Sequence, residues 1–134
     1  MNSSITFQAS ALVALGGALG AWLRFATTQA WAAILGLARA AAFPWATLTA
    51  NVLGSIAMGV LVGWLARQGG GEAWRLLLGV GVLGGFTTFS SFALEVVMLA
   101  QRGAMGSAVL YVAVSLVGGL AGLFGALMLM RGAS

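Results

Sequence analysis

The side chains that could do chemistry in this chain are few, and their types exclude most enzyme mechanisms. The sequence contains no Cys and no His, and both of its acidic residues are glutamates. It therefore lacks thiolate nucleophiles, the common zinc ligands and every Ser-His-Asp arrangement. This inventory disfavours hydrolytic and redox enzyme chemistry. We expect a protein that is not an enzyme.

Polar residues recur at four-residue spacing inside otherwise apolar stretches. Two such rows are Thr47, Asn51 and Ser55, and Tyr111, Ser115 and Gly119. Residues four apart lie on the same face of a helix. Polar groups are costly at membrane depth, where they usually face a partner or a water-filled path. A single hydroxyl such as that of Ser115 more often bonds its own helix backbone, so it is a weak signal taken alone.

Residues 84–92 (GGFTTFSSF) place two glycines and four hydroxyl residues within another apolar stretch. This composition is a poor helix former, so we predict a break in the helix there. A broken transmembrane helix frees carbonyl and amide groups, which are tolerated at depth only where they bind something or line a cavity. Glu95 follows Thr88 by seven residues, on the same helix face. Its carboxyl is either a structural hydrogen-bonding group or part of an ion path, and the sequence leaves both open.

The composition is that of a membrane protein. Of 134 residues, 61% are hydrophobic and 6% are charged, and the mean hydropathy is +1.06. A bilayer core of about 30 Å requires roughly 20 apolar residues of helix. Four runs fit, at about residues 9–35, 44–66, 74–100 and 105–130. We predict an all-α membrane protein with four transmembrane helices in a single integral membrane domain, residues 1–134. The first run is expected to be a retained span, because no positively charged segment precedes it.

Glycines four residues apart recur in every span: Gly16/Gly20, Gly59/Gly63, Gly81/Gly85 and Gly118/Gly122. Small residues at this spacing let helices approach closely in lipid, which is a sufficient explanation for most of them. Four short helices leave little interior. We therefore expect a second copy of the chain to complete the core.

The six arginines, which give a net charge of +4, are scattered singly and form no basic patch for nucleic acid. If the spans alternate, one side of the membrane carries Arg67, Arg75 and Arg131, and the other carries Arg39 and Arg102, with Arg24 added if its side chain reaches that way. Orientation follows the excess of positive charge in short loops, and here there is almost none. A chain so balanced could insert both ways and form an antiparallel homodimer. A single orientation with a weak signal is equally open.

At these residues the chain resembles the Fluc family of fluoride channels, over nearly its whole length. The matching pieces are GGALGAWLR at residues 16–24, PWATLTAN at residues 44–51 and GGFTTFSSF at residues 84–92. The resemblance implies a fluoride-selective channel that exports fluoride passively across the bacterial inner membrane. It also implies a dual-topology, antiparallel homodimer with two pores, whose partners are fluoride, membrane lipid and a second copy of itself.

The resemblance further implies roles for single residues. Phe89 and Phe92 would line the pores, with Asn51 and Ser115 as hydrogen-bond donors. The other candidate pore-lining residues are Tyr111, Thr88, Glu95 and Arg24. Fluoride is small and tightly hydrated, so donors and the positive edges of aromatic rings must replace its water.

A structural sodium ion is also implied at the dimer centre, held by the backbone carbonyls of Gly84 and Thr87 from both subunits. Carbonyl oxygens suit a hard cation. Three positions depart from the family pattern: Ala46 replaces the usual glycine, Ser91 the usual threonine, and Gly119 a second serine found in some members. The last change interrupts the hydroxyl row beyond Ser115.

Two other functions compete with the channel. A small proton-coupled exporter would use Glu95 as its carrier, although comparable four-helix exporters place their essential glutamate in the first span, where this chain has Arg24 and no acid. A non-transporting membrane scaffold would use the glycines for assembly alone, which leaves Asn51 and the threonine-rich segment without a purpose.

Overall fold

The computed structural model describes residues 3–132, and every regular element in that range is helical. Helix α1 covers Ser3–Leu35, α2 covers Leu37–Ala42, α3 covers Trp45–Arg67 and α7 covers Met105–Gly132. Between α3 and α7 lie α4 (Glu72–Trp74), the π-helical segment η1 (Arg75–Leu83), α5 (Gly84–Phe86) and α6 (Phe89–Gln101). Four helical stretches of the described chain are long and apolar enough to cross a membrane. The prediction of an all-α protein with four spans is confirmed.

The connection between the first two spans contains a short helix that the sequence pattern did not predict. Helix α1 ends at Leu35, and the next residue, Gly36, has a φ of 78°, in the left-handed region that glycine adopts readily. The six-residue helix α2 follows it, and Phe43 then continues in an extended conformation to Pro44. Helix α3 begins directly after this proline, whose carbonyl accepts a hydrogen bond from the Leu48 amide in the first turn.

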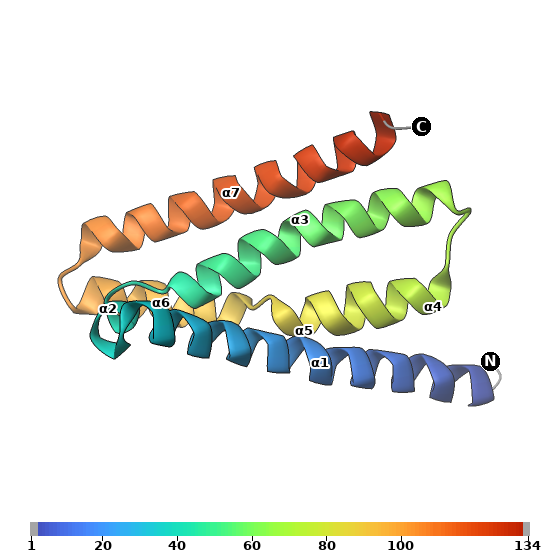
Figure 1. Ribbon diagram of the computed structural model, residues 1–134, viewed down its shortest axis with the longest axis horizontal. Helices are drawn as coiled ribbons and strands as arrows, with labels where there is room; N and C mark the ends of the chain where they lie inside the picture. Colours follow the sequence, from blue (N-terminus) through green and yellow to red (C-terminus); the bar gives the residue numbers. More distant parts are fainter. Residues whose placement is uncertain (1–2, 133–134) are drawn as a thin grey trace.

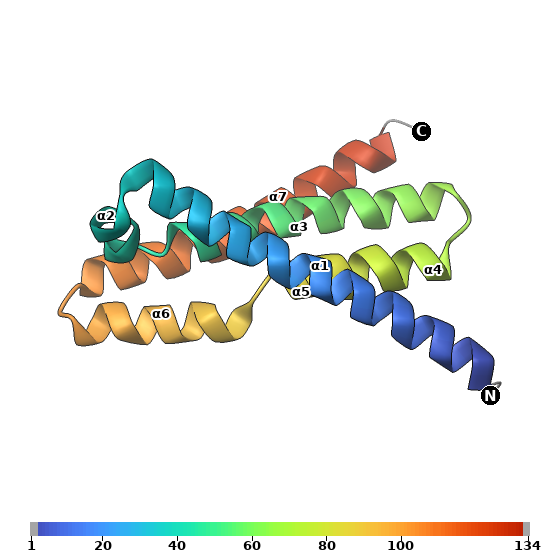
Figure 2. The same ribbon diagram turned by 60° about the horizontal axis from the view of Figure 1, so that its bottom comes forward.

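The third span is continuous from α4 to α5 and then changes direction. Thr87 and Thr88 are both extended, with ψ angles of 155° and 122°. Helix α6 begins at the next residue and lies to one side of α5 (Figure 2). The segment between the two helices, Thr87–Thr88, is called the break below.

The spans run along one long axis, with α1 beginning and α7 ending at the same end of the molecule (Figure 1). Helices α3 and α7 lie side by side and run in the same direction, because one span separates them in the chain (Figure 1). Helix α1 packs mainly against the first part of the third span, η1 and α5.

Glycines set the closest helix contacts. Gly16 and Gly20 of α1 bring that helix against the backbone of η1 and α5, at Gly81 and Gly85. A Cβ at Gly81 would lie 2.8 Å from the Cα of Gly16, which no side chain tolerates. Gly17, between them in sequence, faces open space. The small-residue spacing predicted from the sequence thus marks one helix interface in detail.

The buried core of a single chain is small. It centres on Leu99, Ala108 and Tyr111. Partly buried apolar residues surround it: Phe43, Leu48, Phe92, Val96 and Ala104. Many large apolar side chains elsewhere are exposed, for example Leu120 and Leu129 on α7. Lipid or another protein chain is the environment in which such a surface is stable.

Candidate functional site

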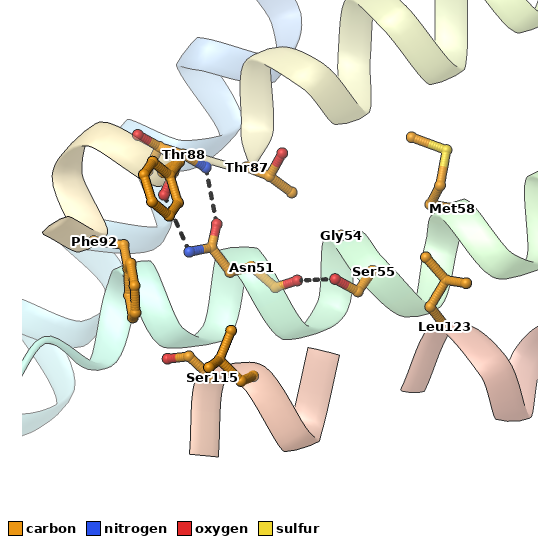
Figure 3. A pocket seen from close by; sticks show the side chains of 11 residues that line it. Asn51, Gly54, Ser55, Met58, Thr87, Thr88, Phe92, Ser115 and Leu123 are labelled. Atoms are coloured by element: carbon orange, nitrogen blue, oxygen red, sulfur yellow. Dashed lines mark hydrogen bonds between the residues drawn. The ribbon is translucent and has the colours of Figure 1, made fainter. Parts of the chain in front are cut away.

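A cavity of about 340 Å³ opens beside the break, where α3, α6 and α7 meet. Its polar lining comes from Asn51 and Ser55 of α3, Thr87 and Thr88 of the break, and Ser115 of α7. Gly54, Met58, Phe89, Phe92, Leu116 and Leu123 complete the wall. Figure 3 shows these side chains converging from three separate segments of the chain.

Asn51 joins helix α3 to the break. Its Oδ1 accepts a hydrogen bond from the Thr88 amide at 2.8 Å, and its Nδ2 donates to the Thr88 carbonyl at 3.1 Å (Figure 3). Both main-chain groups of Thr88 are therefore bonded by one side chain, as an extended residue between two helices requires. One of the two Nδ2 hydrogens of Asn51 is not used by this pairing.

Thr88 in turn starts helix α6. Its Oγ1 accepts a hydrogen bond from the Ser91 amide at 3.2 Å, which is the usual geometry of a helix N-cap. In an unbroken helix the amides of Thr88 and Ser91 would bond the carbonyls of Gly84 and Thr87. Here both amides bond side chains instead, so these two carbonyls are released. Backbone carbonyl oxygens are the kind of ligand that a hard cation prefers.

Ser115 has a hydroxyl that is buried and has no hydrogen-bond partner within the described part of the chain. Buried hydroxyls are normally paired, because leaving one unpaired costs roughly 1–3 kcal/mol. Its position in the cavity wall makes it a donor available to a bound ligand.

A second hydrogen-bonded group lies one helical turn from the cavity. Glu95 accepts a hydrogen bond from the Thr47 hydroxyl at one carboxyl oxygen and from the Tyr111 hydroxyl at the other, both at 2.7 Å. Tyr111 is fully buried and Thr47 is nearly so. Both carboxyl oxygens are thus held in place.

The two polar rows seen in the sequence face each other across the parallel pair α3 and α7. Thr47 and Tyr111 meet at Glu95. One turn further on, Asn51 and Ser115 line the same cavity. After another turn, Ser55 lies against Gly119. The rows therefore form three successive levels along the helix pair.

Aromatic rings connect the first two levels. The centroid of the Phe92 ring lies 5.1 Å from that of Tyr111 and 5.9 Å from that of Phe89. Phe43 also packs edge-on against Tyr111, with ring centroids 5.6 Å apart. Phe89 is 81% exposed, so its ring lies at the surface of the chain beside the cavity.

The structure places most of the predicted site residues together. Asn51, Thr88, Phe89, Phe92 and Ser115 line the cavity, and Glu95 and Tyr111 lie one level away. Arg24 is half-buried on α1 and is not part of the cavity wall.

Sequence reasoning did not assign Thr47 or Ser55 to the site, although both belong to the row that contains Asn51. The four-residue spacing was the signal that could have included them. Met58, Leu116 and Leu123 carried no signal, because apolar residues are everywhere in these spans.

Comparison with known proteins gives consistent matches over most of the chain. The model of the family described as CrcB-like protein, Camphor Resistance (CrcB), matches residues 11–127. A protein of Novosphingobium aromaticivorans named fluoride-specific ion channel FluC is 59% identical over 124 residues, which are 92% of this chain and 97% of that protein. Proteins of the same name from Erythrobacter litoralis and Sphingopyxis alaskensis are 48% and 50% identical; the alignments cover 98% of both chains for the first, and 89% of this chain and 92% of the relative for the second.

Proposed function

The chain belongs to the CrcB family, and from this premise we propose that it is a fluoride-specific ion channel of the cell membrane, through which fluoride leaves the cell passively. Relatives that bear this name align with nearly the full length of the chain. The observation that carries the proposal is the cavity at the break, whose wall contains both the unpaired hydroxyl of Ser115 and the amide of Asn51.

The chemistry of the cavity suits a small anion that must lose water. Ser115 and the unused Nδ2 hydrogen of Asn51 offer two donors fixed by the surrounding helices. The edge of an aromatic ring carries partial positive charge, and the Phe92 ring stands in the same wall. Because these groups are already in position, binding requires little reorganisation and offsets part of the desolvation cost.

The level of Thr47 and Tyr111 extends the path along the helix pair. The Thr47 and Tyr111 hydroxyls now donate to Glu95, and each could turn toward a passing anion. Arg24 is assigned a less direct role, at a distance from the cavity, as a positive charge that attracts anions toward the channel.

The working unit is proposed to be an antiparallel homodimer with two pores. Support comes from the exposed ring of Phe89, from the many exposed apolar side chains and from the nearly balanced arginines. A sodium ion at the centre of such a dimer would bind the released carbonyls of Gly84 and Thr87 from both subunits.

The alternatives have less support. Glu95 is held by two hydrogen bonds beside a fully buried tyrosine, a setting that favours a fixed structural acceptor over a mobile proton carrier. A scaffold without transport gives no reason for an unpaired hydroxyl in a cavity wall.

The direct test is ion efflux from liposomes that contain the purified protein. Under an imposed potential, fluoride should leave rapidly and chloride should not. Ser115→Ala and Asn51→Ala should each slow fluoride efflux, and Ser115→Ala should leave folding intact, because that hydroxyl bonds no other group of the described chain. Equal passage of chloride, or no efflux from well-folded wild-type protein, would overturn the proposal.

A further inference from the structure

The third level of the two polar rows differs from the others, because only one helix supplies a side chain there. Gly119 of α7 has none, and a Cβ added to it would lie 3.3 Å from the Oγ of Ser55 and 3.9 Å from its Cβ. The Ser55 hydroxyl therefore occupies the space in front of Gly119. The gap that Gly119 leaves in the row on α7 is filled from α3.

Ser55 is also part of the cavity wall, one helical turn from Asn51 (Figure 3). On the side of Ser55 away from Asn51, Figure 3 shows Met58 and Leu123, which are apolar. Ser55 is thus the last hydroxyl before the wall becomes apolar in that direction. An anion moving along the wall loses its hydrogen-bond donors beyond this point.

The Ser55 proton is available at small cost. The hydroxyl donates to the Asn51 carbonyl at 2.7 Å. This carbonyl lies inside α3, where the amide four residues further on already bonds it. Rotation about the Cβ–Oγ bond therefore redirects the proton into the cavity without leaving a buried acceptor unpaired.

We propose that Ser55 contacts fluoride in the pore and supplies, from α3, the hydroxyl donor for the level at which α7 has only Gly119. This inference rests on the proposed fluoride channel and adds one ion-contacting residue to it. Fluoride then meets donors at two successive levels of the cavity wall, first at Asn51 and Ser115 and next at Ser55.

The experiment moves the hydroxyl from one helix to the other. Ser55→Ala removes the donor and keeps a good helix former, and we expect fluoride efflux to fall about fivefold, the effect of one lost hydrogen bond. Adding Gly119→Ser to Ser55→Ala places a hydroxyl in the same space from α7. The added Cβ then meets only the Cβ at position 55, at an ordinary contact distance. This double variant should recover most of the wild-type efflux.

The matched control is Ser55→Ala with Gly119→Ala, which adds the same Cβ without the hydroxyl and should stay slow. Size-exclusion profiles of all variants report folding and assembly. The inference is wrong if Ser55→Ala conducts at the wild-type rate, or if the serine and alanine variants at position 119 restore efflux equally or not at all. Failure of wild-type protein to pass fluoride would instead refute the channel itself.

Discussion

The polar side chains around the cavity differ in how much of their hydrogen-bonding capacity the protein already uses. In Asn51 the Oδ1 accepts a hydrogen bond from Thr88 and one Nδ2 hydrogen donates to it, and the Ser55 hydroxyl donates to a helix carbonyl. The hydroxyl of Ser115 makes no hydrogen bond within the described part of the chain. An anion binds at the lowest cost where donors are unused, so Ser115 and the second hydrogen of Asn51 should form its strongest contacts.

Replacement of Phe89 and Phe92 tests whether the edges of their rings act on the ion or the rings only fill space. Isoleucine keeps most of the apolar volume and removes the positive ring edge. We expect Phe89→Ile and Phe92→Ile each to reduce fluoride efflux by roughly tenfold or more, while the protein still purifies normally. Phe7→Ile is the control, because Phe7 is 75% exposed near the start of α1. Efflux near the wild-type rate in both site variants would assign the path to the Asn51 and Ser115 faces alone.

The need for a titrating carboxyl at Glu95 distinguishes a proton-coupled exporter from a channel. Glu95→Gln keeps the size of the side chain and one acceptor oxygen for Thr47 or Tyr111, and it removes titration. We expect a loss of stability of about 1 kcal/mol, from one weakened hydrogen bond, and fluoride efflux close to wild type. A pH-sensitive dye inside the liposomes should record no protons moving in fixed ratio with fluoride. Loss of efflux in a folded dimer, or such a ratio in the wild type, would favour the exporter.

At the scale of elements, the four spans and the polar rows could be predicted from the sequence because both depend on local spacing. The unusual composition of residues 84–92 pointed to an interruption, and the extended residues Thr87 and Thr88 lie within it. The short helix α2 and the π-helical segment η1 were not predicted. The residues of α2 are strong helix formers, but the segment is too short to show as a span. Residues of η1 lie within the predicted third span, and local propensity does not distinguish a π-helix from an α-helix.

The pairing of the polar rows could not be predicted either. Which residue of α3 faces which residue of α7 depends on the register of the helix pair. That register is set by close contacts such as Gly59 with Ala126 and Gly122 with Ile56. Contacts of this kind join residues distant in sequence, and the four-residue spacing alone permits several of them.

The interface between α1 and the third span gives a prediction with a neighbouring control. A Cβ at Gly16 would press on the backbone of η1 at Leu77, Gly81 and Val82. Overpacking of this kind costs about 1–3 kcal/mol, so Gly16→Ala should lower the thermal stability of the protein in detergent. Gly17→Ala adds the same group toward open space and should leave stability unchanged or slightly higher. Equal effects of the two changes would contradict the packing seen between these helices.

At the largest scale, a single chain leaves its cavity open and many apolar side chains exposed. The cavity opens to one side, and the Phe89 ring projects from the surface beside it. The arginines are divided almost evenly between the two ends, so they give little preference for one direction of insertion. The antiparallel pair proposed above would explain these features together, because it would close the cavities and require both orientations.

Dual topology can be tested by biasing the insertion of the chain. Lysines at Ala38 and Ala42, which are exposed on α2, should hold that end on the cytoplasmic side, because positive loops are retained there. Lysines at the exposed positions Gln68 and Ala73 should bias the opposite end in the same way. Each variant expressed alone lacks an antiparallel partner, so we expect almost no fluoride efflux from cells. Co-expression of the two supplies both orientations and should restore efflux. The comparison controls for damage by the lysines, since the same substitutions are present in the active pair. Undiminished efflux from either biased variant alone would rule out the antiparallel dimer and require a pore built from chains in one orientation.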